Sequence, residues 1–203
     1  RGIQGRYFRN RRFRDRDQAI ERVDPHLEFQ FHSDSPGADI PAEEFSIRWE
    51  GGLIIDDSGD FDFRLVTENG ARLWVNDPQN PLIDAWVRSG DQKEYEATTR
   101  LLAGRVYPLR LDHFKFKDET ASVVLQWRPP HGGWQVIPQR NLTPGRFPRT
   151  MVVEADFPAD DSSVGYERGT TVSATWDQAT TRAAIEVAGK VVDHLESLSG
   201  CKP

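Results

Sequence analysis

The chain has 203 residues, of which 37% are hydrophobic and 10% aromatic, and this allows one large domain or one domain with an appendage. A formal net charge of −6 argues against nucleic acid or an anionic membrane as the main partner. No apolar run is long enough to span a bilayer, and a single cysteine, Cys201, excludes a disulfide within the chain. Because the chain starts at Arg1 rather than Met and carries no signal peptide, we expect it to be a fragment of a larger protein.

The N-terminal segment is the one strongly basic part of the chain. Two interpretations are open: an anion-binding arm interleaved with aromatic residues, or a solvated strand face balanced by nearby acidic residues. The acidic charge of the whole chain favours the second interpretation. The residues concerned are Arg1, Arg6, Arg9, Arg11, Arg12, Arg14 and Arg16, with Tyr7, Phe8 and Phe13, and the acidic Asp15, Asp17, Glu21 and Asp24.

From Gly2 to about Arg149 the sequence predicts short strands separated by turn residues. Apolar and polar residues alternate within the segments, as in strands with one buried face, and Gly, Pro, Asn and Asp cluster between them. Six tryptophans and eleven phenylalanines also suit strands. This pattern is typical of a sandwich or barrel, so we expect a mainly β fold. The predicted strands are 45–50, 60–66, 71–75, 82–86, 94–102, 105–112 and 121–127.

The segment from Ser58 to Asp77 predicts a hairpin with a polar tip. Phe61, Phe63 and Leu65 alternate with charged residues, and the alternation resumes after the turn at 68–70, where a glycine is free to take a positive φ. The hairpin therefore carries oxygen ligands at its tip and aromatic residues beside it. That arrangement suits a polar ligand or a hard cation better than it suits catalysis.

The character of the sequence changes after Phe157. A loop precedes a predicted amphipathic helix from Val172 to Leu198, whose apolar residues recur at three- and four-residue steps and require a partner surface. We therefore divide the chain into a β-sandwich domain, 1–149, and a loop and helical extension, 150–203, interpreted as the truncated start of the next domain. The apolar stripe consists of Val172, Trp176, Ala179, Ala183, Val187, Val191, Leu195 and Leu198.

A series of motifs in the β region resembles the PA-14 domain, the β-sandwich module named for the anthrax protective antigen fragment. The motifs run from FSIRWEG at 45–51 through SGDFDFRL, TENGARLWVND, LIDAW, LLAGRVYPLRLDHF and ASVVLQW to IP at 137–138. Several motifs in the right order make a specific signal. The resemblance covers about 2–142. It implies an antiparallel β-sandwich in a secreted or surface-exposed module, often a carbohydrate binder and sometimes calcium-dependent.

The resemblance also implies a site at the hairpin tip. In the calcium-dependent lectins of the family this turn carries two consecutive aspartates joined by a cis peptide bond, and the matching positions here are Glu68 and Asn69. Calcium takes about six to eight oxygen ligands, and replacing Asp by Asn removes a charge while replacing Asp by Glu lengthens the reach. Two alternatives stay open: a calcium site at Glu68 and Asn69, or a polar hairpin turn with a trans bond.

Polar and aromatic residues that follow the hairpin extend the predicted sugar site. Planar polar groups hold sugar hydroxyls, and aromatic rings stack on the C–H faces of sugars. We expect the ligand at one loop end of the sandwich. Two other tryptophans, Trp74 and Trp127, lie within predicted strands and are expected to pack in the core or at an edge. The predicted ligand-binding residues are Glu68, Asn69, Asn76, Asp77, Asp84, Trp86 and Trp134.

A second resemblance concerns residues 156–180, which are similar to a segment of large secreted bacterial proteins that contain cytochrome-c-type haem modules. The haem-attachment pattern Cys-x-x-Cys-His is absent, so we expect no haem in this chain. The resemblance implies a parent protein in the periplasm, at the cell surface or outside the cell.

No catalytic motif occurs in the sequence, which lacks Gly-x-Ser-x-Gly, a Gly-rich phosphate loop and histidines at zinc-like spacing. We therefore predict a non-catalytic carbohydrate-binding module of an exported bacterial protein. Its partners would be a glycan or polysaccharide and other domains of the same parent chain. It would need no cofactor unless calcium binds at the hairpin tip. The rival hypothesis is a structural or protein-interaction module without sugar binding.

Overall fold

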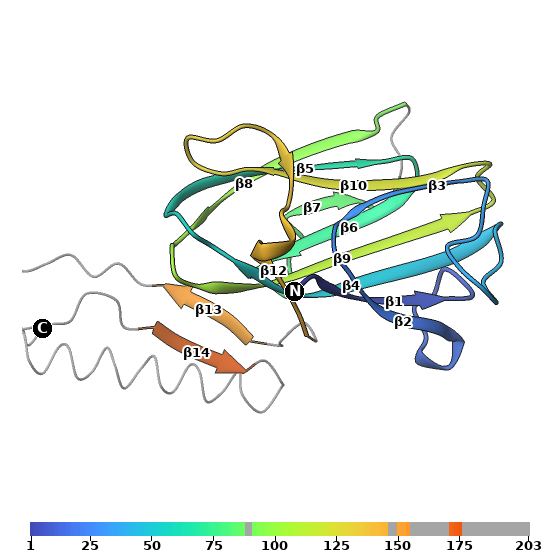
Figure 1. Ribbon diagram of the computed structural model, residues 1–203, viewed down its shortest axis with the longest axis horizontal. Coiled ribbons are helices and arrows are strands. Elements are labelled where there is room, and N and C mark those ends of the chain that lie inside the picture. The colour runs from blue at the N-terminus through green and yellow to red at the C-terminus, as the bar shows by residue number, and fades with distance from the viewer. Residues whose placement is uncertain (88–90, 146–149, 155–170, 176–203) are drawn as a thin grey trace, which may run out of the picture. The chain divides into compact units, whose positions relative to one another are not determined.

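The computed structural model describes residues 1–87, 91–145, 150–154 and 171–175 (Figure 1). The chain divides into two units, Arg1–Phe147 and Pro148–Pro203. The first unit consists of two antiparallel sheets that enclose a single hydrophobic core. Within the described residues, no helix is long and apolar enough to cross a membrane.

Sheet A is the seven-stranded sheet of the first unit. Its strands follow the spatial order β2-β1-β4-β9-β6-β7, and β12 pairs with the far end of β4. The two longest strands, β4 and β9, pair over their full length at its centre. The strands are β1 (Ile3–Phe8), β2 (Gln18–Asp24), β4 (Glu44–Ile54), β6 (Gly70–Val75), β7 (Ile83–Ala85), β9 (Val106–Phe116) and β12 (Leu142–Pro144).

Sheet B is the five-stranded sheet that covers the other side of the core. Its spatial order is β11-β10-β5-β8, and β3 pairs with β10. Two short 3-10 helices, η1 (Asp15–Asp17) and η2 (Gln139–Asn141), lie in the connections. The strands are β3 (Glu28–His32), β5 (Gly59–Thr67), β8 (Glu94–Leu101), β10 (Ala121–Arg128) and β11 (Gln135–Val136).

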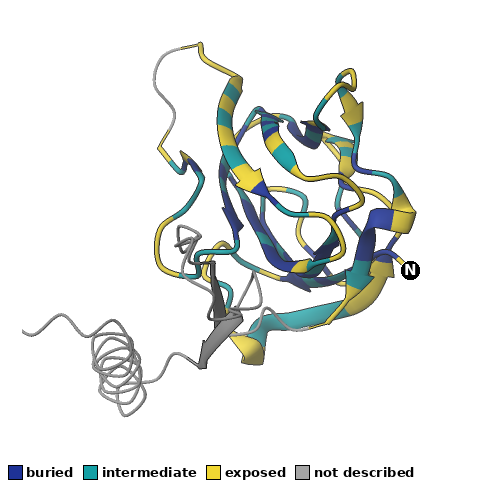
Figure 2. Cartoon of the chain, turned by 90° about the vertical axis from the view of Figure 1, so that its left-hand side faces the viewer, coloured by how far each residue is buried: buried dark blue, intermediate teal, exposed yellow. Residues whose placement is uncertain are grey.

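The core lies between the inner faces of the two sheets. Figure 2 shows buried and more exposed residues alternating along the strands, as the two-residue period of a strand requires. Phe61, Phe63 and Leu65 of β5 point inward from sheet B, and Trp49 and Leu111 point inward from sheet A. The expectation of a mainly β, antiparallel fold is confirmed. Trp74 and Trp127 are both buried, as expected.

The seven predicted strands correspond to β4, β5, β6, β7, β8, β9 and β10, whereas β1, β2, β3, β11 and β12 were not among them. The basic N-terminal segment contains β1, the connection with η1, and the start of β2, and the charged residues on the outer face of the two strands, Arg6 and Glu21, are half-buried and exposed, respectively. The interpretation as a strand face therefore holds for β1 and β2. The connection between them is a basic loop of nine residues.

The second unit contains one described hairpin, in which β13 (Thr150–Glu154) pairs with β14 (Thr171–Thr175). The predicted start of the helix at Val172 is wrong, because this residue lies inside β14. The β-branched residues Thr171, Val172 and Thr175 favour a strand over the first turn of a helix. The rest of the predicted helix, from Trp176 to Leu198, lies outside the described residues.

Candidate functional site

A row of charged residues crosses the outer face of sheet A. Each is the direct cross-strand partner of the next, so all six side chains project from the same face of the sheet. In spatial order the charged row consists of Glu21, Arg6, Arg48, Asp112, Arg72 and Asp84.

Asp112 lies at the centre of the charged row and is only 2% exposed. Arg48 donates to both of its carboxylate oxygens, at 2.8 and 2.7 Å, and Arg110 also donates to both. Burial by itself would raise the pKa of Asp112, but the hydrogen bonds and positive charges of the two arginines outweigh it and hold the pKa below its usual value. Asp112 therefore orients two planar guanidinium groups on this face.

A second row of cross-strand partners lies on the same face, two residues along each strand from the charged row, and is here called the aromatic row after its two phenylalanines. Phe8, Ser46, Phe114 and Gly70 are successive cross-strand partners. Gly70 leaves room for the ring of Phe114, which a Cβ at that position would overlap. Trp86 follows β7 and packs on Phe114, with 4.7 Å between ring centroids. Phe114 of the aromatic row thus packs between the Trp86 ring and the sheet.

Trp86 is half-buried and has polar groups at its margin. Arg72 Nε donates to Asp84 Oδ1 at 2.9 Å, and the Arg72 guanidinium lies over the Trp86 ring, 4.7 Å from its centroid. The backbone N–H of Trp86 donates to the same Asp84 oxygen at 3.0 Å. The Arg72 hydrogen bond is the main cause of the lowered pKa of Asp84. The ring, a guanidinium and a carboxylate together form a small surface site, here called the Trp86 site.

The turn at the hairpin tip lies at the same end of β6 as the Trp86 site. Asn69 is buried there, and its side-chain amide joins this turn to the turn before β10. Its Nδ2 donates to Asp118 Oδ2 at 2.8 Å and to the carbonyl of Thr120 at 3.0 Å, and its Oδ1 accepts from the backbone N–H of Ser122 at 3.3 Å. Asn69 therefore holds two turns together.

Glu68 is also engaged by protein groups. Its Oε1 accepts from Lys93 Nζ at 3.1 Å and its Oε2 accepts from Thr120 Oγ1 at 3.0 Å. The hydrogen bond from Lys93 is the first cause of the lowered pKa of Glu68. No peptide bond among the described residues is cis, so the Glu68-Asn69 bond is trans. The part of the chain that the structure describes contains no group of three His, Cys, Asp or Glu placed to hold a metal. Calcium at this turn stays a prediction.

We expect Asn69→Ala to lower the free energy of unfolding by about 1–3 kcal/mol, because it leaves the buried N–H of Ser122 without its partner. Glu68→Ala is the matched control on the neighbouring residue. It removes an ion pair with the half-exposed Lys93, so its cost should stay below about 1 kcal/mol. Urea denaturation measures both. Equal effects of the two variants would contradict a structural role for the Asn69 amide.

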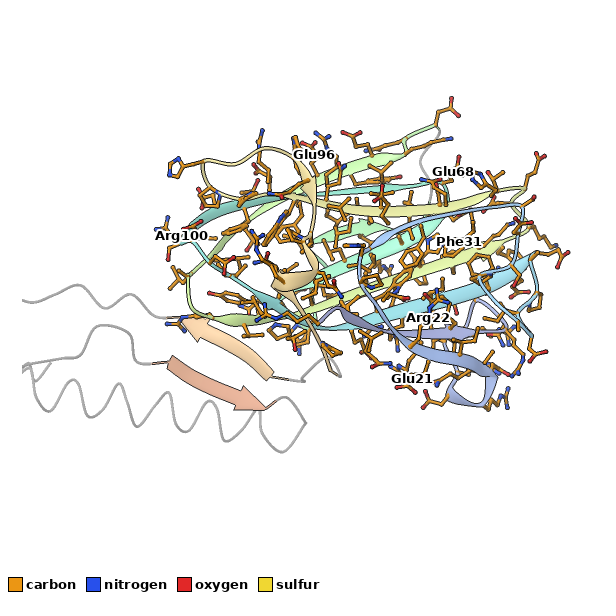
Figure 3. All side chains as sticks on the ribbon, in the orientation of Figure 1. Glu21, Arg22, Phe31, Glu68, Glu96 and Arg100 are labelled. Atoms are coloured by element: carbon orange, nitrogen blue, oxygen red, sulfur yellow. The ribbon has the colours of Figure 1, made fainter. Side chains whose placement is uncertain are left out.

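The predicted site residues do not all share one loop end. Asn76 and Asp77 follow β6, whereas Glu68 and Asn69 precede it, so the strand separates them by about 20 Å. The N–H of Asn76 donates to Pro108 near the start of β9, on the side of the β8–β9 turn. Figure 3 shows Glu68 and Arg100, the latter near the end of β8, toward opposite ends of the sandwich. The prediction of a single loop end is wrong for Asn76 and Asp77.

The Asp77 carboxylate accepts hydrogen bonds from residues of its own loop. Its Oδ1 accepts from the backbone N–H of Gln79 at 2.8 Å and of Asn80 at 3.2 Å, and its Oδ2 accepts from Asn80 Nδ2 at 2.8 Å. Burial opposes ionisation of Asp77, but these hydrogen bonds outweigh it and lower its pKa. The carboxylate therefore stabilises the loop after β6 as an Asx turn.

Trp134 lies on the outer face of sheet B and is also separate from the Trp86 site. The guanidinium carbons of Arg64 on β5 and Arg128 on β10 lie 4.0 and 5.0 Å from its ring centroid. Both arginines project outward from sheet B, so the indole covers them on that face. The inclusion of Trp134 in the same loop end as Trp86 is wrong, because Trp134 packs on Arg128, which pairs with Asp62 near the start of β5, whereas the turn at Glu68 follows the end of β5.

Residues 1–141 match the PA14 domain family, which corresponds to the two sheets described above. The chain belongs to the PA14 domain family. The anti-sigma-I factor RsgI3 from Acetivibrio thermocellus is 26% identical over 141 residues, which are 70% of this chain and 21% of that protein. A solved structure of an anti-sigma factor domain-containing protein from Clostridium clariflavum is 27% identical, with a TM-score of 0.64 over 71% of this chain and 47% of that chain. This chain therefore spans about a fifth of the curated relative and about half of the solved one.

A PA14 sugar-binding domain from an RTX adhesin has the same fold, with a TM-score of 0.51 at 11% identity over 71% of this chain and 98% of that chain. The match to the PA14 family ends at residue 141. The resemblance of residues 156–180 to a segment of haem-containing proteins stays a prediction, and most of those residues lie outside the described part of the chain.

Three residues that contact the Trp86 ring are not among the predicted site residues: Arg72, Phe114 and Phe13, whose ring centroid lies 5.9 Å from that of Trp86. Arg72 could have been found, because the alternation of β6 places it outward and the short connection to β7 places Asp84 beside it. Phe114 and Phe13 reach Trp86 through strand pairing and loop packing between distant segments, for which a single sequence carries no signal.

Proposed function

We propose that the PA14 unit is a non-catalytic carbohydrate-binding module of a larger exported bacterial protein. Two findings support the proposal: the chain belongs to the PA14 family, and a sugar-binding PA14 domain has the same fold. Its partners would be a glycan and further domains of the parent chain. The parent protein would act in the periplasm, at the cell surface or outside the cell.

The Trp86 site is the observation that carries this proposal. The part of the half-buried indole that stays exposed can pack on the C–H surface of a sugar ring, and the Arg72–Asp84 pair offers donors and acceptors to the sugar hydroxyls. The supporting contacts from Phe114 and Arg72 fix the ring before binding, which reduces the ordering cost. A shallow site of this kind should bind a single sugar unit with about millimolar affinity, so tight attachment would require a polymeric ligand.

Trp86→Ala should weaken binding of the full chain to its glycan by about tenfold, because it removes the stacking platform. A glycan array identifies the ligand, and titration calorimetry then compares the variants. Trp134→Ala is the matched control, since it removes a half-buried tryptophan from the opposite sheet. Loss of binding only in Trp134→Ala would move the site to sheet B. Absence of any glycan binding in the unmodified chain would overturn the proposal.

The alternative is a structural or protein-interaction module. The hydrogen bonds of Glu68 and Asn69 favour this alternative. These residues occupy the turn that carries the calcium site in the lectins of the family, but here their side chains bind Lys93 and Asp118 of the protein itself. The similarity to anti-sigma factor domain proteins is also compatible with a protein partner. A chain that binds no glycan but co-purifies with further domains of its own parent protein would support this alternative.

A further inference from the structure

The loop between β1 and β2, residues 9–17, carries a local charge opposite to that of the chain. It contains five arginines and two aspartates, a net charge of +3, while the chain as a whole carries −6. Three acidic residues in and near the loop are already paired: Asp15 with Arg6 at 3.3 Å, Asp17 with Arg16 at 3.8 Å, and Glu44 with Arg11 at 3.9 Å.

Three arginines of this loop keep an uncompensated charge. Arg12 and Arg14 are exposed, and neither side chain forms an ion pair or hydrogen bond with another described residue. The Arg9 side chain donates to the carbonyl oxygen of Asp39 at 3.1 Å, which is a neutral partner. The loop therefore presents guanidinium groups that are free to bind an anion.

The loop is held against the Trp86 site. Phe13, between Arg12 and Arg14 in sequence, packs against both Phe8 and Trp86. Its ring centroid is 5.8 Å from that of Phe8 and 5.9 Å from that of Trp86.

Three further features fix this placement. Ser46 Oγ donates to the carbonyl of Asn10 at 2.6 Å, and the guanidinium of Arg48 lies over the Phe13 ring at 4.9 Å. Phe13 has a φ of 54°, which is uncommon for a bulky residue and shows that the packing outweighs the backbone cost.

We propose that the Trp86 site takes an anionic polysaccharide, whose carboxylate or sulfate groups bind Arg12 and Arg14. This inference rests on the proposed sugar-binding function and specifies the class of sugar. A sugar ring bound at Trp86 lies next to Phe13, and the long, exposed side chains of Arg12 and Arg14, which flank Phe13 in sequence, can extend to substituents of neighbouring units. The forked geometry of arginine matches carboxylate and sulfate oxygens in the same way. The overall negative charge of the chain disfavours polyanions in general, so selectivity comes from this local contact.

The test uses the full chain with four polymers: alginate as a polyuronate, dextran sulfate, uncharged dextran and double-stranded DNA. We expect alginate or dextran sulfate, but not dextran or DNA, to retard the chain in affinity electrophoresis. The double variant Arg12→Gln/Arg14→Gln should weaken this binding about tenfold, and added salt should weaken it as well. Arg100→Gln, an exposed arginine on β8 of sheet B, is the control and should bind like the unmodified chain.

The possible results separate this inference from the proposed function. Retardation by alginate alone assigns a carboxylate, and retardation by dextran sulfate alone assigns a sulfate. Binding of a neutral glycan that Trp86→Ala weakens, without binding of either anionic polymer, overturns the inference and leaves the proposed function standing. Equal binding of DNA, or anionic binding that persists in Trp86→Ala, reveals a general polyanion surface and overturns it too. If no glycan of any kind binds, both proposals fail.

Discussion

Asp24→Ala is expected to lower the free energy of unfolding of the PA14 unit by about 3–5 kcal/mol. Asp24 ends β2 and is 3% exposed. Its Oδ2 accepts from Tyr7 Oη at 2.6 Å and from Trp49 Nε1 at 2.7 Å, and its Oδ1 accepts from Arg22 Nε at 2.7 Å. Alanine would leave the buried donors of Tyr7 and Trp49 without this acceptor, and each buried orphan donor costs about 1–3 kcal/mol.

The Asp24 network also explains local sequence choices. Gly5 leaves space for the carboxylate, because a Cβ there would lie 2.5 Å from Asp24 Oδ2. Burial raises the pKa of Tyr7, and the hydrogen bond and charge of Asp24 raise it further, so the hydroxyl stays a donor. The network thus ties β1, β2 and β4 together on the inner face of sheet A.

Guanidinium denaturation followed by tryptophan fluorescence measures the effect of Asp24→Ala. Asp62→Ala is the control: Asp62 accepts from Arg128 and Thr98 on the open face of sheet B, where loss of an ion pair should cost about 0.2–1 kcal/mol. Asp24→Asn keeps the shape and one acceptor oxygen, so it should fall between the two and serves if the alanine variant does not fold. Equal costs for Asp24→Ala and Asp62→Ala would contradict the network.

Strands were predicted correctly where apolar and polar residues alternate strictly, and they were missed where the outer face of a strand also carries apolar residues. In β5, Phe61, Phe63 and Leu65 alternate with polar residues, and all three are buried. In β1 the inner residues include Gly5 while the outer residues include the buried Phe8, so the period is hidden. The aromatic row accounts for this loss of alternation, because it places the apolar residues Phe8 and Phe114 on the outer face of sheet A.

The candidate site was predictable where it depended on a hairpin and wrong where it depended on topology. Asp84 and Trp86 lie on and just after β7, which pairs antiparallel with β6 and so returns them to the end of β6 that begins next to Glu68. Asn76 lies at the other end of a six-residue strand, and the length of β6 alone sets that distance. The position of Trp134 depends on which sheet β11 joins, and that choice is made by pairing with β10 rather than by any local pattern.

We expect His113 to make the stability of the PA14 unit depend on pH. Its side chain lies in the core beside Phe31 and Phe45, and neither ring nitrogen has a hydrogen-bond partner among the described residues. Burial lowers the pKa of His113 from 6.5 to about 3, so the folded protein keeps the ring neutral. The unfolded chain takes up a proton below pH 6.5. Stability is therefore fully present above pH 6.5 and is lost as the pH falls from there toward 3.

His113→Leu should remove this pH dependence without loss of stability at pH 7, because an apolar side chain of similar size replaces two unpaired polar atoms. Each pKa unit corresponds to about 1.4 kcal/mol, so the unmodified protein should lose about 2 kcal/mol more than the variant between pH 7 and pH 5. Denaturant titrations at both values give the difference, and His131→Leu, at an exposed loop position, controls for the change of residue type. Parallel losses in His113→Leu and the unmodified protein would mean that the ring is solvated in solution. A steeper loss in the unmodified protein would show that a buried, unpaired imidazole sets the acid limit of this fold.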